Sequence, residues 1–186
     1  MVIKNFNQLI KKVSNFEKKR RVAVVVAQDE HTLEAVFRAK ENNIIIPILI
    51  GNREKIKEII SKNDYVFNDE FIIDVENESA AAYKAVELVN MNQADFIMKG
   101  KIQTADLLRA AVDKEKGIRT GSLMSHFAIL EVPNYHKLLV ITDGGMVMYP
   151  SLEEKKQIIE NAVNVLISLG YEKPKVGVLS AIEKER

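Results

Sequence analysis

The sequence predicts an α/β protein with a doubly wound, mainly parallel sheet, and three observations lead to this fold class. Apolar runs alternate four times with helical patterns between Val22 and Ala111. The clearest runs are continuously apolar and rich in β-branched residues, which is typical of strands buried on both faces. Hydrophobic residues make up 47% of the 186 positions, so the chain can form a substantial core.

The elements of the first half follow from periodicity and from cap residues. Phe6–Phe16 has apolar residues at helical spacing and predicts an amphipathic helix. Buried strands are expected at Val22–Ala27, Ile44–Ile50 and Phe96–Met98, and a further strand at Phe71–Val75. Helices are expected from Asp29 onward, at Glu54–Lys62, at Ser79–Asn90 and from about Thr104.

After Ala111 the regular alternation of strand and helix patterns stops, and the segment Gly117–His126 is rich in small polar residues. We therefore expect one α/β domain over residues 1–115 and the start of a second over 116–186. Two apolar segments, Phe127–Val132 and Leu138–Ile141, flank a Pro-Asn turn signal and predict an antiparallel hairpin. A helix is expected over 151–168, opened by a capping box of Ser151 and Glu154.

The apolar run Val176–Leu179 predicts one more buried strand. The charged residues after it, Ser180–Arg186, are too few to form a helix that covers a sheet face. The second domain is therefore expected to be incomplete.

Composition excludes several classes of protein. Lys and Arg number 27 against 26 Asp and Glu, and a net charge of +1 gives no general basic field for nucleic acid. The absence of cysteine excludes disulfides, thiolate metal sites and a cysteine nucleophile. The three histidines lack metal-ligand spacing, so no metal is expected, and the lack of a long apolar run or signal peptide predicts a soluble, cytoplasmic protein.

Three polar clusters follow or precede expected strands. They are Lys99-Gly100-Lys101 with Thr104, the segment Arg119–His126, and Thr142-Asp143-Gly144-Gly145. Ligands of open α/β sheets collect beyond the carboxyl ends of the strands, where lysine, arginine, hydroxyl and backbone N–H groups bind phosphate oxygens. Each cluster alone is also compatible with an ordinary solvated loop, but together they predict one anion-binding crevice.

Roles can be assigned within that crevice. The residues expected to bind phosphate or a phosphorylated substrate are Lys99, Gly100, Lys101, Thr104, Arg119, Thr120, Gly121, Ser122, Thr142 and Gly144. The catalytic candidates are His126, Ser125 and Asp143. His126 can donate to a developing oxyanion or be a histidine satisfied by its neighbours, Ser125 can be a nucleophile, and Asp143 can orient a base or only shape a turn.

The residues that carry these motifs resemble the phosphate acetyl/butyryltransferase family, and within it the phosphate butyryltransferases. The similarity lies in Met98–Lys101 with Thr104, in Arg119–Ser122 with Ser125-His126, in Ile141–Gly145 with Pro150, and in the segments 151–169 and Val176–Ala181. The resemblance implies that a short acyl-CoA and phosphate exchange to give an acyl phosphate and free CoA. It also implies the two-domain fold of isocitrate and isopropylmalate dehydrogenases, a homodimer, no permanently bound cofactor, and a pathway link to an acyl (butyrate) kinase.

The sequence departs from that family in one respect. Family members usually continue well past the position of Arg186, into an Asn-Asp-Leu-Ser-Arg-Gly stretch that this sequence lacks. We therefore expect the N-terminal portion of a longer enzyme, or a shortened protein. Two other functions remain open at this point: a metal- and NAD-dependent dehydrogenase of the same fold class, and a non-catalytic module that binds CoA or phosphate.

Overall fold

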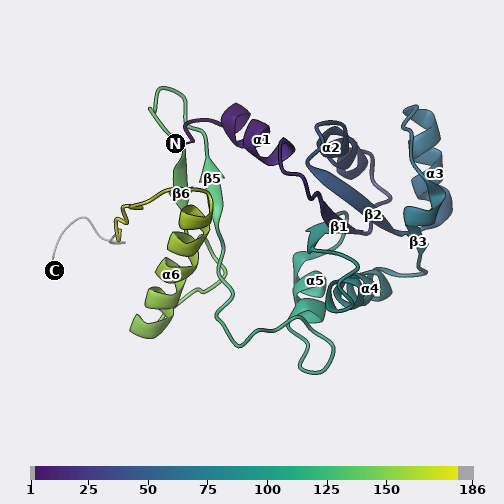
Figure 1. Cartoon of the computed structure of the whole chain (residues 1–186). Helices are drawn as coiled ribbons and strands as arrows, with labels where there is room; N and C mark the ends of the chain where they lie inside the picture. Colours follow the sequence, from purple (N-terminus) through teal and green to yellow (C-terminus); the bar gives the residue numbers. More distant parts are fainter. Residues whose placement is uncertain (1–2, 180–186) are drawn as a thin grey trace. The chain divides into compact units, whose positions relative to one another are not determined.

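The computed structural model describes residues 3–179, and it divides the chain into two compact units (Figure 1). One unit is Ile10–Thr120, and the other comprises the residues before Ile10 together with those after Thr120. The expected domain ranges of 1–115 and 116–186 stay a prediction, because compactness alone does not define a domain. Ser180–Arg186, with the end of the Val176–Ala181 motif, lies outside the described residues.

The unit Ile10–Thr120 is built on a parallel sheet of four strands in the order β3-β2-β1-β4, so the predicted parallel sheet is confirmed. The strands are β1 (Arg20–Val25), β2 (Ile45–Gly51), β3 (Ile72–Asp74) and β4 (Phe96–Lys99). The chain steps outward from β1 to β3 and then returns to the other side of β1. The direction of the strand order therefore reverses between β1 and β4.

Helices cover both faces of this sheet. The helices of the unit are α2 (Glu30–Glu41), α3 (Arg53–Lys62), α4 (Glu78–Asn90) and α5 (Thr104–Ala111), and a 3₁₀ turn, η1 (Asp69–Phe71), precedes β3. The residues of α1 (Phe6–Ser14) are divided between the two units. Side chains of α2 and α3 pack with Val22 and Val24 on one face, and side chains of α4 and α5 pack with Ala23 and Val25 on the other. All four of these β1 residues are fully buried, as the continuous apolar run predicts.

Local side-chain caps determine where three of these helices begin. The side-chain oxygens of Asp29, Asn52 and Asn77 accept hydrogen bonds from backbone N–H groups in the first turns of α2, α3 and α4. Such a bond satisfies a donor that has no partner within the helix. The predicted start of α2 at Asp29 is therefore confirmed.

Strand β4 is present, but the expectation that Phe96, Ile97 and Met98 are buried is wrong. Phe96 is 43% exposed, and Ile97 and Met98 are half-buried. The reason is position, because within residues 3–179 β4 is an edge strand whose one pairing partner is β1. An apolar run predicts a strand but does not say whether a neighbour covers each side of it.

In the other unit the predicted hairpin and helix are confirmed. Strands β5 (Ala128–Leu130) and β6 (Leu139–Ile141) pair antiparallel, with Ile129 opposite Val140. Helix α6 (Leu152–Ser168) begins with the predicted capping box, in which Ser151 and Glu154 each accept from the other's backbone N–H. Ile158 and Ala162 are the buried residues of α6.

The predicted buried strand at Val176–Leu179 is wrong. These residues form no strand, and the exposed fraction rises from 51% at Val176 to 93% at Leu179. A strand forms only when another strand offers it hydrogen-bond partners, and residues 3–179 place none beside this segment. In the same range of residues, no helix has both the length and the apolar character needed to cross a bilayer.

Candidate functional site

The first polar cluster lies where the strand order reverses, at the carboxyl ends of β1 and β4, which is where open α/β sheets bind ligands. Here the two strand ends approach closely. The Gly100 N–H donates to the Val25 carbonyl at 2.8 Å, and the Lys101 N–H donates to the Val26 carbonyl at 3.0 Å. A Cβ on Gly100 would lie 2.4 Å from the Val26 oxygen, so this position has room only for glycine.

Those two hydrogen bonds affect the predicted role of Gly100. Its N–H group is used within the protein, so the close approach that glycine permits is between two strands. The backbone also turns sharply beside it, since Val26 has a φ of 55°, which β-branched residues rarely adopt. Strained backbone of this kind is concentrated at binding and catalytic sites.

Lys99, Lys101 and Thr104 bring polar groups to the same edge. The Lys99 ammonium donates to the Gly100 carbonyl at 3.2 Å, and Lys101 and Thr104 are exposed. Thr104 is the first residue of α5, and the preceding Gln103 makes no side-chain capping bond within the described chain. The positive end of the α5 dipole is therefore near Lys101, and both features favour an anion.

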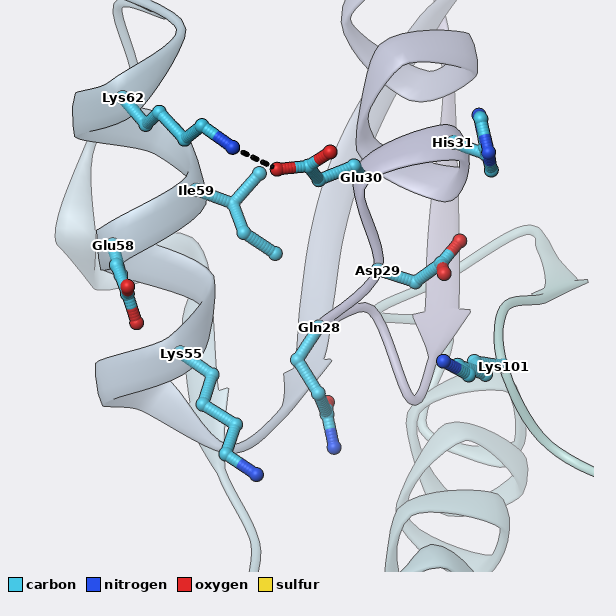
Figure 2. Close-up of a pocket in the computed structure, with 9 residues that line it drawn as sticks. All are labelled: Gln28, Asp29, Glu30, His31, Lys55, Glu58, Ile59, Lys62 and Lys101. Carbon is cyan, nitrogen blue, oxygen red and sulfur yellow. Dashed lines mark hydrogen bonds and ion pairs between the residues drawn. The ribbon is translucent and has the colours of Figure 1, made fainter.

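Lys101 also lines a pocket of about 560 Å³ beyond the ends of β1 and β2 (Figure 2). The other residues of this pocket come from the start of α2 and from one side of α3. Its lining consists of Gln28, Asp29, Glu30, His31, Lys55, Glu58, Ile59, Lys62 and Lys101.

The Gln28 side chain is held at the base of this pocket by its neighbours. Its Oε1 accepts from the Asn52 N–H at 3.2 Å, which leaves the amide NH₂ turned the other way. A Cβ at Gly51 would lie 1.9 Å from that Oε1, so only glycine leaves space for the amide. Figure 2 shows the ammonium groups of Lys55 and Lys101 directed toward the Gln28 amide from two sides.

Two acidic residues of the pocket already have partners. Asp29 accepts from the Thr32 N–H at 3.0 Å and from the Thr32 hydroxyl at 2.9 Å, and these bonds, helped by Lys101, hold the pKa of Asp29 below its usual value. Glu30 forms an ion pair with Lys62 at 2.5 Å between α2 and α3. Lys55 and Lys101 are thus the lysines of this pocket outside that pair.

Sequence reasoning missed Gln28 and Lys55 as site residues. A signal for both was present, because each follows the end of a parallel strand, β1 or β2, as Lys101 follows β4. Neighbouring parallel strands end at the same edge of a sheet, so short segments after different strands meet in space. The prediction concentrated on clusters that are contiguous in sequence.

The second cluster begins in the unit Ile10–Thr120 and continues in the other. Arg119 and Thr120 are residues at the end of the first unit, and Thr120 is exposed. The loop before them is tied down, since Asp113 accepts from the Glu115 and Lys116 N–H groups and from the Tyr83 hydroxyl. Gly121, which follows, has a φ of +85° in the left-handed region.

The third cluster brings His126 and Asp143 together in the unit that contains α6. Asp143 Oδ1 accepts from the His126 N–H at 2.8 Å, and Oδ2 accepts from the Val147 N–H at 2.6 Å. Burial raises the pKa of Asp143, but the backbone N–H donors outweigh it and the net pKa lies below its usual value. The carboxylate is charged at neutral pH and organises the backbone on both sides.

His126 is also fixed from the other direction. Its carbonyl accepts from the Thr142 hydroxyl at 2.6 Å. Its imidazole lies over Gly144, where a Cβ would come within 3.1 Å of Nδ1. Thr142, Asp143 and Gly144 therefore all contribute to the position of His126, which the sequence places in a different polar cluster.

The Ser125 side chain is held by α6. Its hydroxyl accepts from the Asn161 amide at 3.0 Å, and the same amide donates to the Leu123 carbonyl at 2.9 Å. Ser122 and Gly121 are exposed just before this segment. The helix thus holds the chain from Leu123 to Ser125 and positions His126 after it.

The structure therefore assembles two groups of predicted site residues. Lys99, Gly100, Lys101 and Thr104 share the edge of the parallel sheet, and Thr142, Asp143 and Gly144 surround His126. Since each unit is described by itself, the single crevice that combines the clusters stays a prediction. Among residues 3–179, no three His, Asp or Glu side chains are grouped so that they could hold a metal ion.

Comparison with known proteins gives a consistent result. A family model described as "Phosphate acetyl/butaryl transferase" matches residues 74–186. The phosphate butyryltransferase of Clostridium acetobutylicum is 46% identical over 182 residues, which is 98% of this chain and 60% of that protein. That of Clostridium beijerinckii is 41% identical over 97% of this chain and 59% of its own length.

Solved structures agree with the sequence comparison. The crystal structure of a branched-chain phosphotransacylase from Enterococcus faecalis V583 superposes with a TM-score of 0.71 and 27% identity, over 90% of this chain and 58% of that one. The chain thus spans about 60% of the length of the two clostridial enzymes.

Proposed function

Because the chain belongs to the phosphate acetyl/butaryl transferase family, we propose that it takes part in acyl transfer between CoA and phosphate. The reaction is that of a short or branched acyl-CoA with inorganic phosphate to give an acyl phosphate and free CoA. The observation that carries the proposal is the 46% identity to a phosphate butyryltransferase over 98% of this chain, a match long enough to include most of the predicted clusters.

The reaction requires that acyl-CoA and phosphate be positioned next to each other and that their negative charges be neutralised. A phosphate oxygen attacks the thioester carbonyl, a carbon–oxygen bond forms, the carbon–sulfur bond breaks, and the CoA sulfur leaves as a thiolate that takes up a proton. Two anionic reactants must be brought together, so cationic and N–H donors at the site supply much of the rate enhancement. Lys99, Lys101, Thr104 and Arg119 are the residues we propose for binding the anions.

His126 is the residue we propose for stabilising the oxyanion that develops on the thioester carbonyl. Its backbone is held by Asp143 and Thr142, and Gly144 leaves room for its ring. Asp143 is then a positioning residue, because both of its oxygens accept from backbone N–H groups. Ser125 is proposed to align the same segment through Asn161, since direct attack by phosphate needs no protein nucleophile.

Finer features rest on the resemblance alone and are part of the proposal. They are the two-domain architecture of isocitrate and isopropylmalate dehydrogenases, a homodimer, no permanently bound cofactor, and a kinase that uses the acyl phosphate. A cytoplasmic location, expected from the sequence composition, is also part of the proposal. The clostridial relatives are named as acyltransferases, so the comparisons lend no support to a dehydrogenase. They equally lend none to a non-catalytic binding module.

The test is phosphate-dependent release of CoA thiol from butyryl-CoA by this chain. We expect release with phosphate and none without it. His126→Gln should lower kcat about 100-fold, the usual effect of removing an oxyanion donor. His136→Gln, in the exposed turn of the hairpin, is the matched control and should leave the rate unchanged. If no short acyl-CoA releases thiol in the presence of phosphate, the proposal is wrong for this chain.

A further inference from the structure

We propose that Lys55, Lys101 and the amide of Gln28 form a subsite for a phosphate group at the carboxyl ends of β1 and β2. The inference rests on the proposed function, because it assigns part of a phosphorylated substrate to this pocket. The pocket volume of about 560 Å³ is within the range of small-molecule sites. It is contained in the unit Ile10–Thr120, so it depends on residues of that unit alone.

The donors of this subsite converge from three different elements. Lys55 comes from the first turn of α3, Gln28 from the turn after β1, and Lys101 from the turn after β4. Figure 2 shows both ammonium groups directed toward the Gln28 amide. Two ammonium groups and an amide NH₂ around one space offer only donors to a ligand, which matches the acceptor oxygens of a phosphate.

The amide is oriented before any ligand arrives. The Asn52 N–H occupies Oε1 of Gln28, so the NH₂ group is directed away from Asn52. Gly51 has a φ of +154° and lacks the Cβ that would collide with this Oε1. A donor that is already held in place loses less conformational entropy when it binds, and this favours affinity.

The acidic residues of the lining do not cancel this donor set. Asp29 is occupied by Thr32 and Glu30 by Lys62. In the view of Figure 2 the Lys55 side chain lies between the Glu58 carboxylate and Gln28. The local excess of positive charge at Lys55 and Lys101 therefore remains where the amide lies, although the pocket as a whole holds as many acids as lysines.

Two sources of phosphate fit this chemistry, namely a phosphate group of CoA and inorganic phosphate. Isothermal titration calorimetry on the whole chain separates them with four probes: CoA, 3′-dephospho-CoA, pantetheine and inorganic phosphate. The variants are Lys55→Gln and Gln28→Met. Lys57→Gln is the matched control, because Lys57 lies on the same helix, loses the same charge, and pairs with Asp69 outside the pocket.

We expect Lys55→Gln to weaken CoA binding about tenfold, which corresponds to the loss of one hydrogen bond to a charged group. Gln28→Met should weaken it less, and Lys57→Gln should leave it unchanged. Pantetheine, which has no phosphate, should bind each protein equally. If the loss disappears with 3′-dephospho-CoA, the pocket holds the 3′-phosphate, and if it persists, the pocket holds the diphosphate.

If the two variants weaken inorganic phosphate and not CoA, the subsite is confirmed with inorganic phosphate as its ligand. The inference is overturned if every probe binds both variants as it binds the unaltered chain, or if the unaltered chain binds neither CoA nor phosphate. If the unaltered chain binds CoA but releases no thiol from an acyl-CoA in the presence of phosphate, the proposed function is contradicted and the subsite is not.

Discussion

Gly100 shows how a single hydrogen atom in place of a side chain determines the geometry at the edge of the sheet. A Cβ there would meet the Val26 oxygen at 2.4 Å and the Val25 oxygen at 2.5 Å. Both are backbone atoms of the central strand region, so neither can move aside as the end of a flexible side chain would. A larger residue at Gly100 would therefore push β4 away from β1.

Gly100→Ala should destabilise the chain by about 2 kcal/mol, the usual cost of overpacking a well-packed site. Urea-induced unfolding followed by circular dichroism measures this change. Gly177→Ala is the control, because a Cβ at Gly177 meets nothing within 4 Å and its φ is not in the left-handed region. Equal stability of the two variants would show that β4 tolerates a shift away from β1.

At this scale the sequence predicted which residue types gather near the site but not what each one does. Lys101 lines a pocket, and Thr142, Asp143 and Gly144 surround His126. Gly100 was expected to approach a ligand, yet its N–H bonds to Val25. A glycine in a turn indicates that another group comes close to the backbone. Only the folded structure shows whether that group is a ligand or a neighbouring strand.

The capping box of α6 is the clearest feature at the level of elements. Ser151 Oγ accepts from the Glu154 N–H at 3.3 Å, and Glu154 Oε2 accepts from the Ser151 N–H at 2.8 Å. The N–H of Ser151 and then its hydroxyl hold the pKa of Glu154 below its usual value. This cap begins the helix that carries Asn161, which in turn holds Ser125.

Ser151→Ala should cost about 1 kcal/mol of stability, since it removes the acceptor for a first-turn N–H. The free energy of unfolding in urea measures the loss. Ser168→Ala, at the other end of α6, serves as control, because its hydroxyl only donates to the Val165 carbonyl within the last turn and its loss should be smaller. A cap that contributes nothing would make the two variants indistinguishable.

Elements whose signals are local were predicted well from the sequence. The caps at Asp29 and Ser151 and the hairpin turn before Leu138 depend on residues only a few positions apart, so the sequence contains the whole cause. The burial of β4 and the state of Val176–Leu179 depend on which strands lie beside them. That is a property of tertiary structure, and an apolar run cannot reveal it.

Acid should destabilise the whole molecule through several carboxylates. Asp29, Asp95, Asp113 and Asp143 all have a pKa below the usual value, for which backbone N–H donors are the principal lowering cause. Because the pKa of each carboxyl is lower in the folded state, its ionised form stabilises the folded chain, and this stabilisation is fully present above the unfolded-state pKa of about 4. It is lost as the pH falls through the folded pKa.

The urea midpoint should therefore be nearly constant from pH 7 to pH 5 and fall steeply below about pH 4. Asp95→Asn should reduce that fall, because Asp95 accepts from the Arg21 N–H at 2.8 Å and pairs with Arg20 and Arg21. Glu34→Gln, at an exposed position of α2, is the control and should keep the full acid dependence. Equal curves for the two variants would contradict a role for Asp95.

The start of the chain belongs with its later half, and this has a consequence for biosynthesis. The Tyr171 hydroxyl donates to the Ile3 carbonyl at 2.7 Å, and the Phe6 N–H donates to the Glu131 carboxylate at 2.6 Å. A ribosome makes about 5 to 20 residues each second. After their own synthesis Ile3 and Phe6 therefore wait several seconds or longer, while all of Ile10–Thr120 is made, before either of these partners exists.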